Sequence, residues 1–533
     1  MLLIPLTIVA QELDRPKLVV GIVVDQMRWD YLYRFTDQYT ETGFKRLLSD
    51  GFSCENTYIN HLPSFTAVGH TVIYTGSVPA ITGIVGNSWY NRTQHQKVYC
   101  AADSAVTTVG SDSDEGKMSP RNMFCTTIGD QLRLATNFKS KVVGVSLKDR
   151  AAILPAGHNP TGAFWYDTKS GNFITSTYYM DELPGWVSNF NAKKYPEKLM
   201  EKGWKPLLSK DKYKKSAADD SPWEGLLEEG SKPVFPYDTK KLFAKDKGVI
   251  HTTPFGNTLT LNFAEAAIEG YRLGQSDETD MLTINLAATD YAGHLFGINS
   301  IEIEDVYIRL DRDLSDFINY LDNRIGRGNY LLFLTADHGG AHSAGFMEAN
   351  KLVGGISISD KELKKSLNGE LKKAFAIDNL VLTVMNDEVY FDRDKIKKQN
   401  IDFGKVAETA ANYLKNIPEV LYAVIEENAG SASVQAVIRE KIVNGYNYQR
   451  SGDIRIIPKD GYLPSYCTTG TTHGKWNSYD THIPLIFFGK NITAGKSNKQ
   501  FYMNDIAPTI AAYLNIEAPS GCVGKVITPV LGE

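Results

Sequence analysis

Carboxylate and imidazole side chains stand in pairs at two places in this sequence. Asp337 and His338 are adjacent in TADHGG, and Asp290 and His294 are four positions apart in ATDYAGH. Carboxylate oxygens and imidazole nitrogens are ligands that suit zinc, and residues four apart meet on one face of a helix. These four residues are therefore candidate metal ligands. In the plainer interpretation, Asp337 caps a turn and His338 is solvated.

Two more residues of the same types lie far away along the chain. Asp25 ends the apolar run KLVVGIVVD, and His473 lies in the Gly/Thr-rich loop TTGTTHGKW, ahead of the apolar run Ile483 to Phe488. Asp25 repeats the pattern of Asp337, although an aspartate at this place can also cap the next helix. We therefore add Asp25 and His473 to the candidate ligands. His482 adjoins the second run, and we expect it to be structural, held by a carbonyl group.

A hydroxyl, an amide and two cations complete the candidate set. Thr66 falls in the first turn of a helix predicted from Phe65 to Tyr74, where free N–H groups attract anions, so its hydroxyl can bind a phosphate, attack one, or merely cap the helix. Asn87 follows a glycine-rich turn and is either an amide donor or a turn residue. Lys148 and Arg150 suit a multiply charged oxyanion, or else pair with an acid at the surface.

The elements that must position these residues are predicted from apolar runs of strand length. The runs are Lys17 to Asp25, Lys141 to Leu147, Met281 to Thr289, the first half of the segment 329–340, and Ile483 to Phe488. Runs of this kind are typical of strands that are buried on both faces of a parallel sheet, and ligands bind beyond the carboxyl ends of such strands. The sequence therefore predicts an α/β fold with a central, mostly parallel sheet flanked by helices.

The length of 533 residues is compatible with one large domain that carries insertions. We predict a single domain over 11–533, with insertions at about 155–254 and 350–460 that form a cap or lid over the site. The first of these is rich in Trp, Tyr, Lys and Pro, and the second alternates charged helical segments with short strands. Both boundaries rest on composition and periodicity alone.

The first ten residues, MLLIPLTIVA, are apolar but too short to cross a bilayer. They fit the remnant of a signal peptide, although a basic segment before them is missing. The sequence thus predicts an exported protein, periplasmic or secreted, and no other segment is a transmembrane candidate.

Composition narrows the classes of partner. The net charge of −5 comes without a basic tail or stripe, so no nucleic-acid partner is predicted. The five cysteines include no C-x-x-C, which argues against a thiolate zinc site and allows at most two disulfides, with no pairing implied. We expect small-molecule ligands and favour a monomer.

The motifs that carry these residues occur in a characteristic order. They read VVDQMR, NHLPSFTAVGH, GNSWYNR, LKDR, TDYAGH, TADHGG, TTHGKW and DIAPTIAAYL. With them the chain resembles the alkaline phosphatase superfamily and, within it, the PafA-type bacterial phosphomonoesterases, over nearly its whole length. This resemblance implies the alkaline phosphatase-like α/β fold and two zinc ions. One zinc would be held by Asp290, His294 and His473, and the other by Asp25, Asp337, His338 and the alkoxide of Thr66.

The resemblance also implies a reaction. Phosphate monoesters would be hydrolysed through a phosphothreonine at Thr66, while Asn87, Lys148 and Arg150 contact the phosphoryl oxygens. Because the two cations take the corresponding place, no third (magnesium) site is predicted.

Two alternatives remain open at this point. A nucleotide pyrophosphatase/phosphodiesterase-like hydrolase would require the aromatic segment from Trp165 to Trp204 to form a nucleoside or lipid slot. A more distant alternative is a secreted zinc- or phosphate-binding protein without turnover. Such a binder would share the ligands but would form no covalent intermediate.

Overall fold

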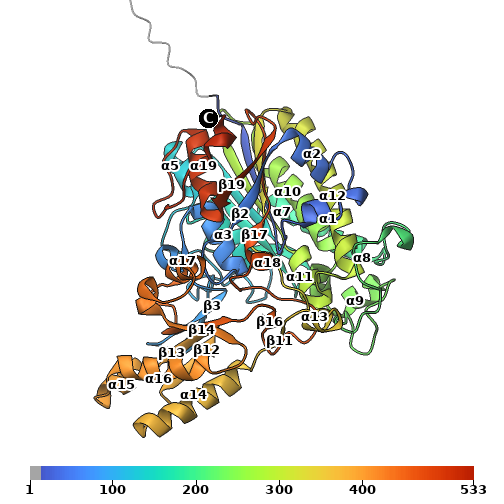
Figure 1. The fold of residues 1–533 in the computed structure, drawn as a ribbon. Coiled ribbons are helices and arrows are strands. Elements are labelled where there is room, and N and C mark those ends of the chain that lie inside the picture. Colours follow the sequence, from blue (N-terminus) through green and yellow to red (C-terminus); the bar gives the residue numbers. More distant parts are fainter. Residues whose placement is uncertain (1–13, 533) are drawn as a thin grey trace, which may run out of the picture.

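The computed structural model describes residues 14–532, and an eleven-stranded sheet runs through it (Figure 1). The order is β17 (His482–Ile483), β2 (Phe52–Tyr58), β18 (Leu485–Gly489), β10 (Tyr330–Thr335), β1 (Leu18–Val24), β9 (Asp280–Leu286), β6 (Val142–Ser146), β7 (Gly162–Asp167), β8 (Asn172–Ser176) and β5 (Thr108–Val109), with β19 (Gly495–Tyr502) beside β2.

The middle of the sheet is parallel, as predicted. β10, β1, β9, β6 and β7 all run in one direction, and Val20 lies opposite Leu332 on one side and Leu282 on the other. Every residue of β1 is buried, which explains its unbroken apolar sequence. Helices such as α3 (Thr66–Thr75) and α19 (Ile506–Leu514) lie on one side of the sheet, and α10 (Phe255–Tyr271) and α12 (Ile301–Leu321) on the other (Figure 1).

One central neighbour runs the other way. β18 is antiparallel to β10, with Leu485 opposite Thr335. The beginning of β18 therefore lies at the edge where β10 ends. The chain before β18, which includes His473, is thereby brought to the carboxyl ends of the parallel strands.

The first part of the predicted insertion at 155–254 belongs to the main sheet and one of its helices. Pro155 belongs to helix α6 (Asp149–Ala156), and β7 and β8 extend the main sheet beside β6. The run GAFWYD of β7 is fully buried, so it behaves as a core strand that composition alone did not distinguish from an insertion. Trp165 and Trp204 are only 1% and 0% exposed, and both belong to the main hydrophobic core.

The segment predicted as a second insertion, 350–460, contains an antiparallel sheet with its own hydrophobic core. The strand order is β12 (Val381–Met385), β13 (Glu388–Phe391), β15 (Ile454–Pro458) and β14 (Val420–Ile425), and α14 (Asp360–Phe375), α15 (Arg393–Lys398) and α16 (Phe403–Lys415) are its main helices. In Figure 1 it extends away from the main sheet, at the lower left. The charged stretch between β13 and β14 forms two helices, α15 and α16, because Asp402 caps a new helix through the N–H of Lys405.

The proposed signal remnant, residues 1–10, lies outside the described residues. Of the helices within 14–532, none has both the length and the apolar character needed to cross a bilayer. The five cysteines all fall within that range and carry free thiols: Cys54, Cys100, Cys125, Cys467 and Cys522.

Candidate active site

The six candidate ligands form two groups of three at the carboxyl edge of the sheet. One group is Asp290, His294 and His473, and the other is Asp25, Asp337 and His338; the ligand atoms within each group lie within 4.8 Å of one another. Asp25 directly follows β1 and Asp337 follows β10, while Asp290 lies on α11 (Ala288–Phe296), just after β9. The expected meeting of strand ends is thus present in the structure.

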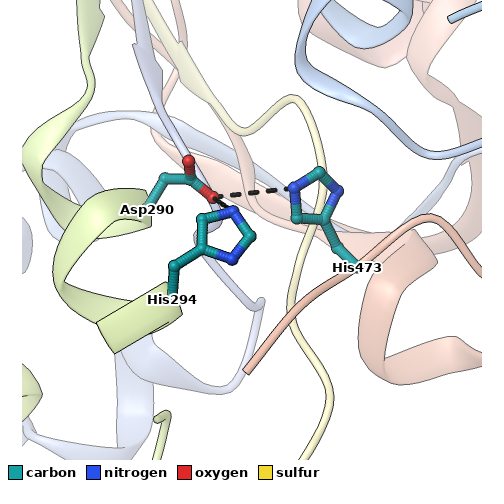
Figure 2. Close-up of side chains that lie close together, drawn as sticks. All are labelled: Asp290, His294 and His473. Carbon is teal, nitrogen blue, oxygen red and sulfur yellow. Dashed lines mark ion pairs between the residues drawn. The ribbon is translucent and has the colours of Figure 1, made fainter. Parts of the chain in front are cut away.

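The first group combines a helix and a distant loop. One turn of α11 aligns His294 with Asp290, and Nε2 of His294 lies 3.1 Å from Oδ1 of Asp290. Nε2 of His473, from the distant loop, points toward the same oxygen at 3.7 Å (Figure 2). All three polar atoms face a common centre, as ligands of one ion must.

All three histidines of the two groups are oriented in the same way. The Nδ1 atom of each ring meets a backbone carbonyl oxygen, which can only accept a hydrogen bond. Nδ1 therefore carries a proton, and Nε2 faces the carboxylates, where it can bind a metal ion. The pairs are His294 with Thr471 at 2.8 Å, His338 with Gly339 at 2.9 Å, and His473 with Ser64 at 2.7 Å.

Two carboxylate oxygens of the second group are buried without a donor. Among the described residues, neither Oδ1 of Asp25 nor Oδ2 of Asp337 accepts a hydrogen bond. Nε2 of His338 lies 3.6 Å from the first and 3.2 Å from the second. Unpaired charges in a buried place are unfavourable, so two such oxygens beside an imidazole nitrogen fit a divalent cation.

The electrostatics of this group lead to the same conclusion. Burial and the neighbouring Asp337 carboxylate raise the pKa of Asp25 to about 7. Burial lowers the pKa of His338, but Asp337 outweighs this effect and raises it to about 9. The carboxylates repel each other in a site of low dielectric, and a bound cation would remove that repulsion.

Lys148 lies between the two groups. Its Nζ donates to Oδ2 of Asp25 at 2.8 Å and to Oδ2 of Asp290 at 2.6 Å, and the residue is 3% exposed. The sequence predicted a cation that faces an oxyanion, whereas the structure shows an ammonium that joins the two carboxylates. Its positive charge is nonetheless at the centre of the site.

Arg150 is oriented by a residue that sequence reasoning missed. Its Nη1 donates to the hydroxyl of Tyr99 at 3.3 Å and lies 3.9 Å from Oδ1 of Asp149. The Nε–H is buried and, among the described residues, meets no acceptor. Tyr99 belongs to the short strand β4 (Gln96–Tyr99), about fifty positions from Arg150, and no local pattern links the two.

Thr66 and Asn87 meet at the beginning of α3. Thr66 is the first residue of the helix, the N-cap residue Phe65 makes no side-chain capping bond, and Oγ1 of Thr66 lies 3.5 Å from Nε2 of His338. Oδ1 of Asn87 accepts from the N–H of Ala67 at 2.9 Å, which leaves the NH₂ end of the amide to meet a ligand. A hydroxyl, an amide and the positive end of a helix thus adjoin the second group of ligands.

Comparisons with known proteins agree with this geometry. A family model described as type I phosphodiesterase / nucleotide pyrophosphatase matches residues 19–482. Alkaline phosphatase PafA from Elizabethkingia meningoseptica is 55% identical over 97% of this chain and 95% of its own length. The crystal structure of wild-type PafA superposes with a TM-score of 0.95, covering 97% of this chain and 99% of the other.

The chain belongs to the PafA-type alkaline phosphatases, within the type I phosphodiesterase / nucleotide pyrophosphatase family. Alkaline phosphatase PhoV from Synechococcus elongatus is also similar, with 50% identity over 98% of this chain and 94% of the relative. A further PafA structure is of a variant in which one threonine, one asparagine, one lysine and one arginine are changed. In that variant the threonine-to-asparagine and lysine-to-arginine spacings equal those of Thr66 to Asn87 and Lys148 to Arg150.

Two residues that support the ligands of this PafA-type site were not predicted. Nε2 of Gln26 donates to Oδ1 of Asp290 at 2.6 Å, while its backbone N–H reaches Oδ1 of Asp337 at 3.2 Å, so Gln26 links the two groups. His70 contacts the carbonyl of Thr66 at 2.8 Å and lies 3.4 Å from Oδ2 of Asp337. Only their positions in the sequence could have indicated them, since Gln26 adjoins Asp25 and His70 lies one helical turn after Thr66.

Gly69 brings the Thr66 helix close to the end of β10. A Cβ at Gly69 would lie 2.4 Å from the backbone oxygen of Asp337. We therefore expect Gly69→Ala to lower the free energy of unfolding by about 1–3 kcal/mol through overpacking, and to lower activity by displacing Thr66. Denaturant unfolding and kcat/KM measure the two effects.

Gly369→Ala is the matched control, because Gly369 lies within α14 and a Cβ there meets nothing within 4 Å. There the better helix propensity of alanine should raise stability by up to about 1 kcal/mol. Equal behaviour of the two variants would mean that Gly69 has no packing role.

Proposed function

We propose that this chain hydrolyses phosphate monoesters and releases inorganic phosphate through a covalent phosphothreonine at Thr66. The observation that carries the proposal is the approach of Thr66, at the start of α3, to a group of metal-ligand type that has unpaired buried oxygens. Full-length similarity to proteins named alkaline phosphatase supports it.

Two zinc ions fit the chemistry of the ligands. Asp290, His294 and His473 would hold one ion, and Asp25, Asp337 and His338 the other, joined by Thr66. Bound zinc lowers the pKa of a hydroxyl and stabilises a departing oxygen. Two Zn²⁺ against three aspartates leave a net positive site, which suits a phosphate dianion. We propose no third, magnesium, site, because Lys148 and Arg150 already supply cations beside these ligands.

The chain's own residues supply the steps of the reaction. The hydroxyl of Thr66 loses its proton as its Oγ attacks phosphorus, the ester P–O bond breaks, and the leaving alkoxide takes up a proton to become the alcohol. Water then cleaves the phosphothreonine, which restores the hydroxyl and yields phosphate. The N-terminal dipole of α3 favours negative charge at Thr66, and the Asn87 amide and the Arg150 guanidinium would donate to the phosphoryl oxygens.

Monoesters are favoured over diesters for two reasons. Lys148 and Arg150 attract a third charged oxygen, whereas a diester would place a neutral alkyl group there. The alternative diesterase would need an aromatic slot from Trp165 to Trp204, but both tryptophans are buried in the core. The joint substitution of threonine, asparagine, lysine and arginine in a PafA variant supports the choice of these four residue types.

Replacing both Lys148 and Arg150 with alanine tests the substrate class. We expect kcat/KM for an aryl phosphate monoester to fall by about 10²–10³-fold, because the Arg150 contact to the phosphoryl oxygens and the positive charge of Lys148 at the centre of the site are both lost. Hydrolysis of a bis-aryl diester should fall far less. Lys139→Ala, which removes a lysine whose side chain is 68% exposed, serves as control and should change neither rate. Equal losses on both esters would remove the basis for preferring monoesters.

We also propose that the enzyme acts outside the cytoplasm, as a monomer and on small-molecule esters. The support is the apolar segment 1–10 and the lack of a basic surface stripe. Cell fractionation of the natural producer, with activity followed in each fraction, tests the location.

A further inference from the structure

The strands β12 and β13 of the second insertion are joined by a two-residue turn, Asn386 and Asp387. Both residues have positive φ, 57° and 58°, as a type I′ hairpin turn requires. Nη1 of Arg455 donates to the carbonyl of Asn386 at 2.9 Å, and the N–H of Ile456 donates to that of Asp387 at 2.8 Å. Arg455 is itself buried and paired with Glu426, so the backbone of the turn has a rigid support.

The side chain of Asn386 braces the loop that carries Asn87. Its Nδ2 donates to the carbonyl of Ser88 at 2.8 Å. A Cβ at Gly86 would come within 2.9 Å of the same nitrogen, so the amide also packs against Gly86. Both chain neighbours of Asn87 therefore rest on one side chain of the insertion.

The side chain of Asp387 anchors the loop that carries His473. Its Oδ2 lies 2.5 Å from Nζ of Lys475, which is 5% exposed. The carbonyl of Lys475 accepts from the hydroxyl of Ser64 at 3.1 Å, and the carbonyl of Ser64 receives Nδ1 of His473. Three successive contacts thus connect Asp387 to the imidazole of His473.

The insertion is docked by other contacts as well. Nη1 of Arg450 donates to the carbonyl of Gly83 at 2.6 Å, and Nδ2 of Asn444 to that of Asn60 at 2.7 Å. These bonds do not involve the turn. Its two side chains can therefore be changed without detaching the insertion.

We propose that Asn386 and Asp387 are positioning residues, which hold the Asn87 loop and the His473 loop at a fixed separation. Adjacent residues of one rigid turn brace two loops that are distant in sequence. The inference rests on the proposed function, which assigns phosphoryl oxygens to Asn87 and a metal ion to His473. The second insertion is then a support of the active site.

Asp387→Gly tests whether the turn positions the His473 loop. It creates Asn-Gly, a pair strongly preferred in type I′ turns, so the hairpin should be kept while the carboxylate is lost. We expect about tenfold weaker binding of one of two zinc ions, measured by competition with a chromophoric chelator, because such supporting contacts typically change metal affinity by 10–100-fold. The unfolding temperature of the metal-free protein should not fall.

Asn386→Gly tests whether the turn positions the Asn87 loop. Glycine also accepts the positive φ, so the turn itself should be kept. We expect kcat/KM for an aryl phosphate to fall about tenfold, with the affinities for both zinc ions unchanged. Asp378→Asn is the control, because it disrupts an exposed ion pair with Lys372 on the same insertion and should alter neither readout.

Wild-type zinc affinity in Asp387→Gly together with wild-type kcat/KM in Asn386→Gly would overturn the proposal. It would also be overturned if the losses followed a lower unfolding temperature of the metal-free protein, which is the mark of a purely structural role. If the proposed function were wrong, the wild-type chain itself would bind no zinc and cleave no monoester. The positioning role of the turn would then be wrong as well.

Discussion

Thr66→Ala is expected to lower kcat/KM for an aryl phosphate monoester by about 10⁴-fold or more. The hydroxyl that we assign as nucleophile would be gone, and removing a nucleophile is among the costliest changes to an enzyme. The nearby hydroxyl of Ser64 cannot replace it, because that group donates to the carbonyl of Lys475. Steady-state kinetics over a range of substrate concentrations measure the loss.

Acid quenching of the enzyme with labelled substrate provides the second readout for Thr66. Label should be trapped on the wild-type chain and on Thr66→Ser, which keeps a hydroxyl, but not on Thr66→Ala. Label on none of the three, together with no turnover, would favour the non-catalytic binding protein. Full turnover by Thr66→Ala would mean that water attacks phosphorus directly.

Removal of metal is expected to have an effect of similar size. EDTA should lower activity by at least about 10³-fold, and zinc, but not magnesium alone, should restore it. The reason lies in the ligands, because three imidazole nitrogens suit zinc, whereas magnesium prefers oxygen. Activity measured during zinc titration, together with metal content by mass spectrometry, should give two ions per chain.

Histidine variants make the metal experiment specific. His473→Ala should lose one of the two ions. His482→Gln should keep both, because Nε2 of His482 contacts the carbonyl of Glu55 at 2.9 Å and lies in neither group. Restoration by magnesium alone, or a third tightly bound ion, would contradict the zinc assignment or the absence of a magnesium site.

The strand-end part of the site was predictable from the sequence. Asp25 and Asp337 follow unbroken apolar runs, and parallel strands that are buried on both faces must end at a common edge. Asp290 and His294 were predictable because their spacing matches one helical turn. The helix that begins at Thr66 was predicted from the sequence too, and in the structure its N-cap residue, Phe65, makes no side-chain capping bond.

The parts that depend on tertiary contacts were not predictable. An apolar run does not reveal its direction, so the antiparallel course of β18, which brings His473 to the site, could not be derived from residues 483–488. Nor could the bridge that Lys148 makes between two aspartates, or the bond from Arg150 to Tyr99. Nor did the aromatic composition of the first predicted insertion indicate that β7 and β8 extend the main sheet.

The antiparallel return of β18 also sets an order of events during synthesis. The two candidate ligand groups use side chains from Asp25 to His473, so the last of these side chains is translated long after the first. A nascent chain on the ribosome therefore lacks a complete site until His473 has been added, and the two ions that we propose can be acquired together only after that point.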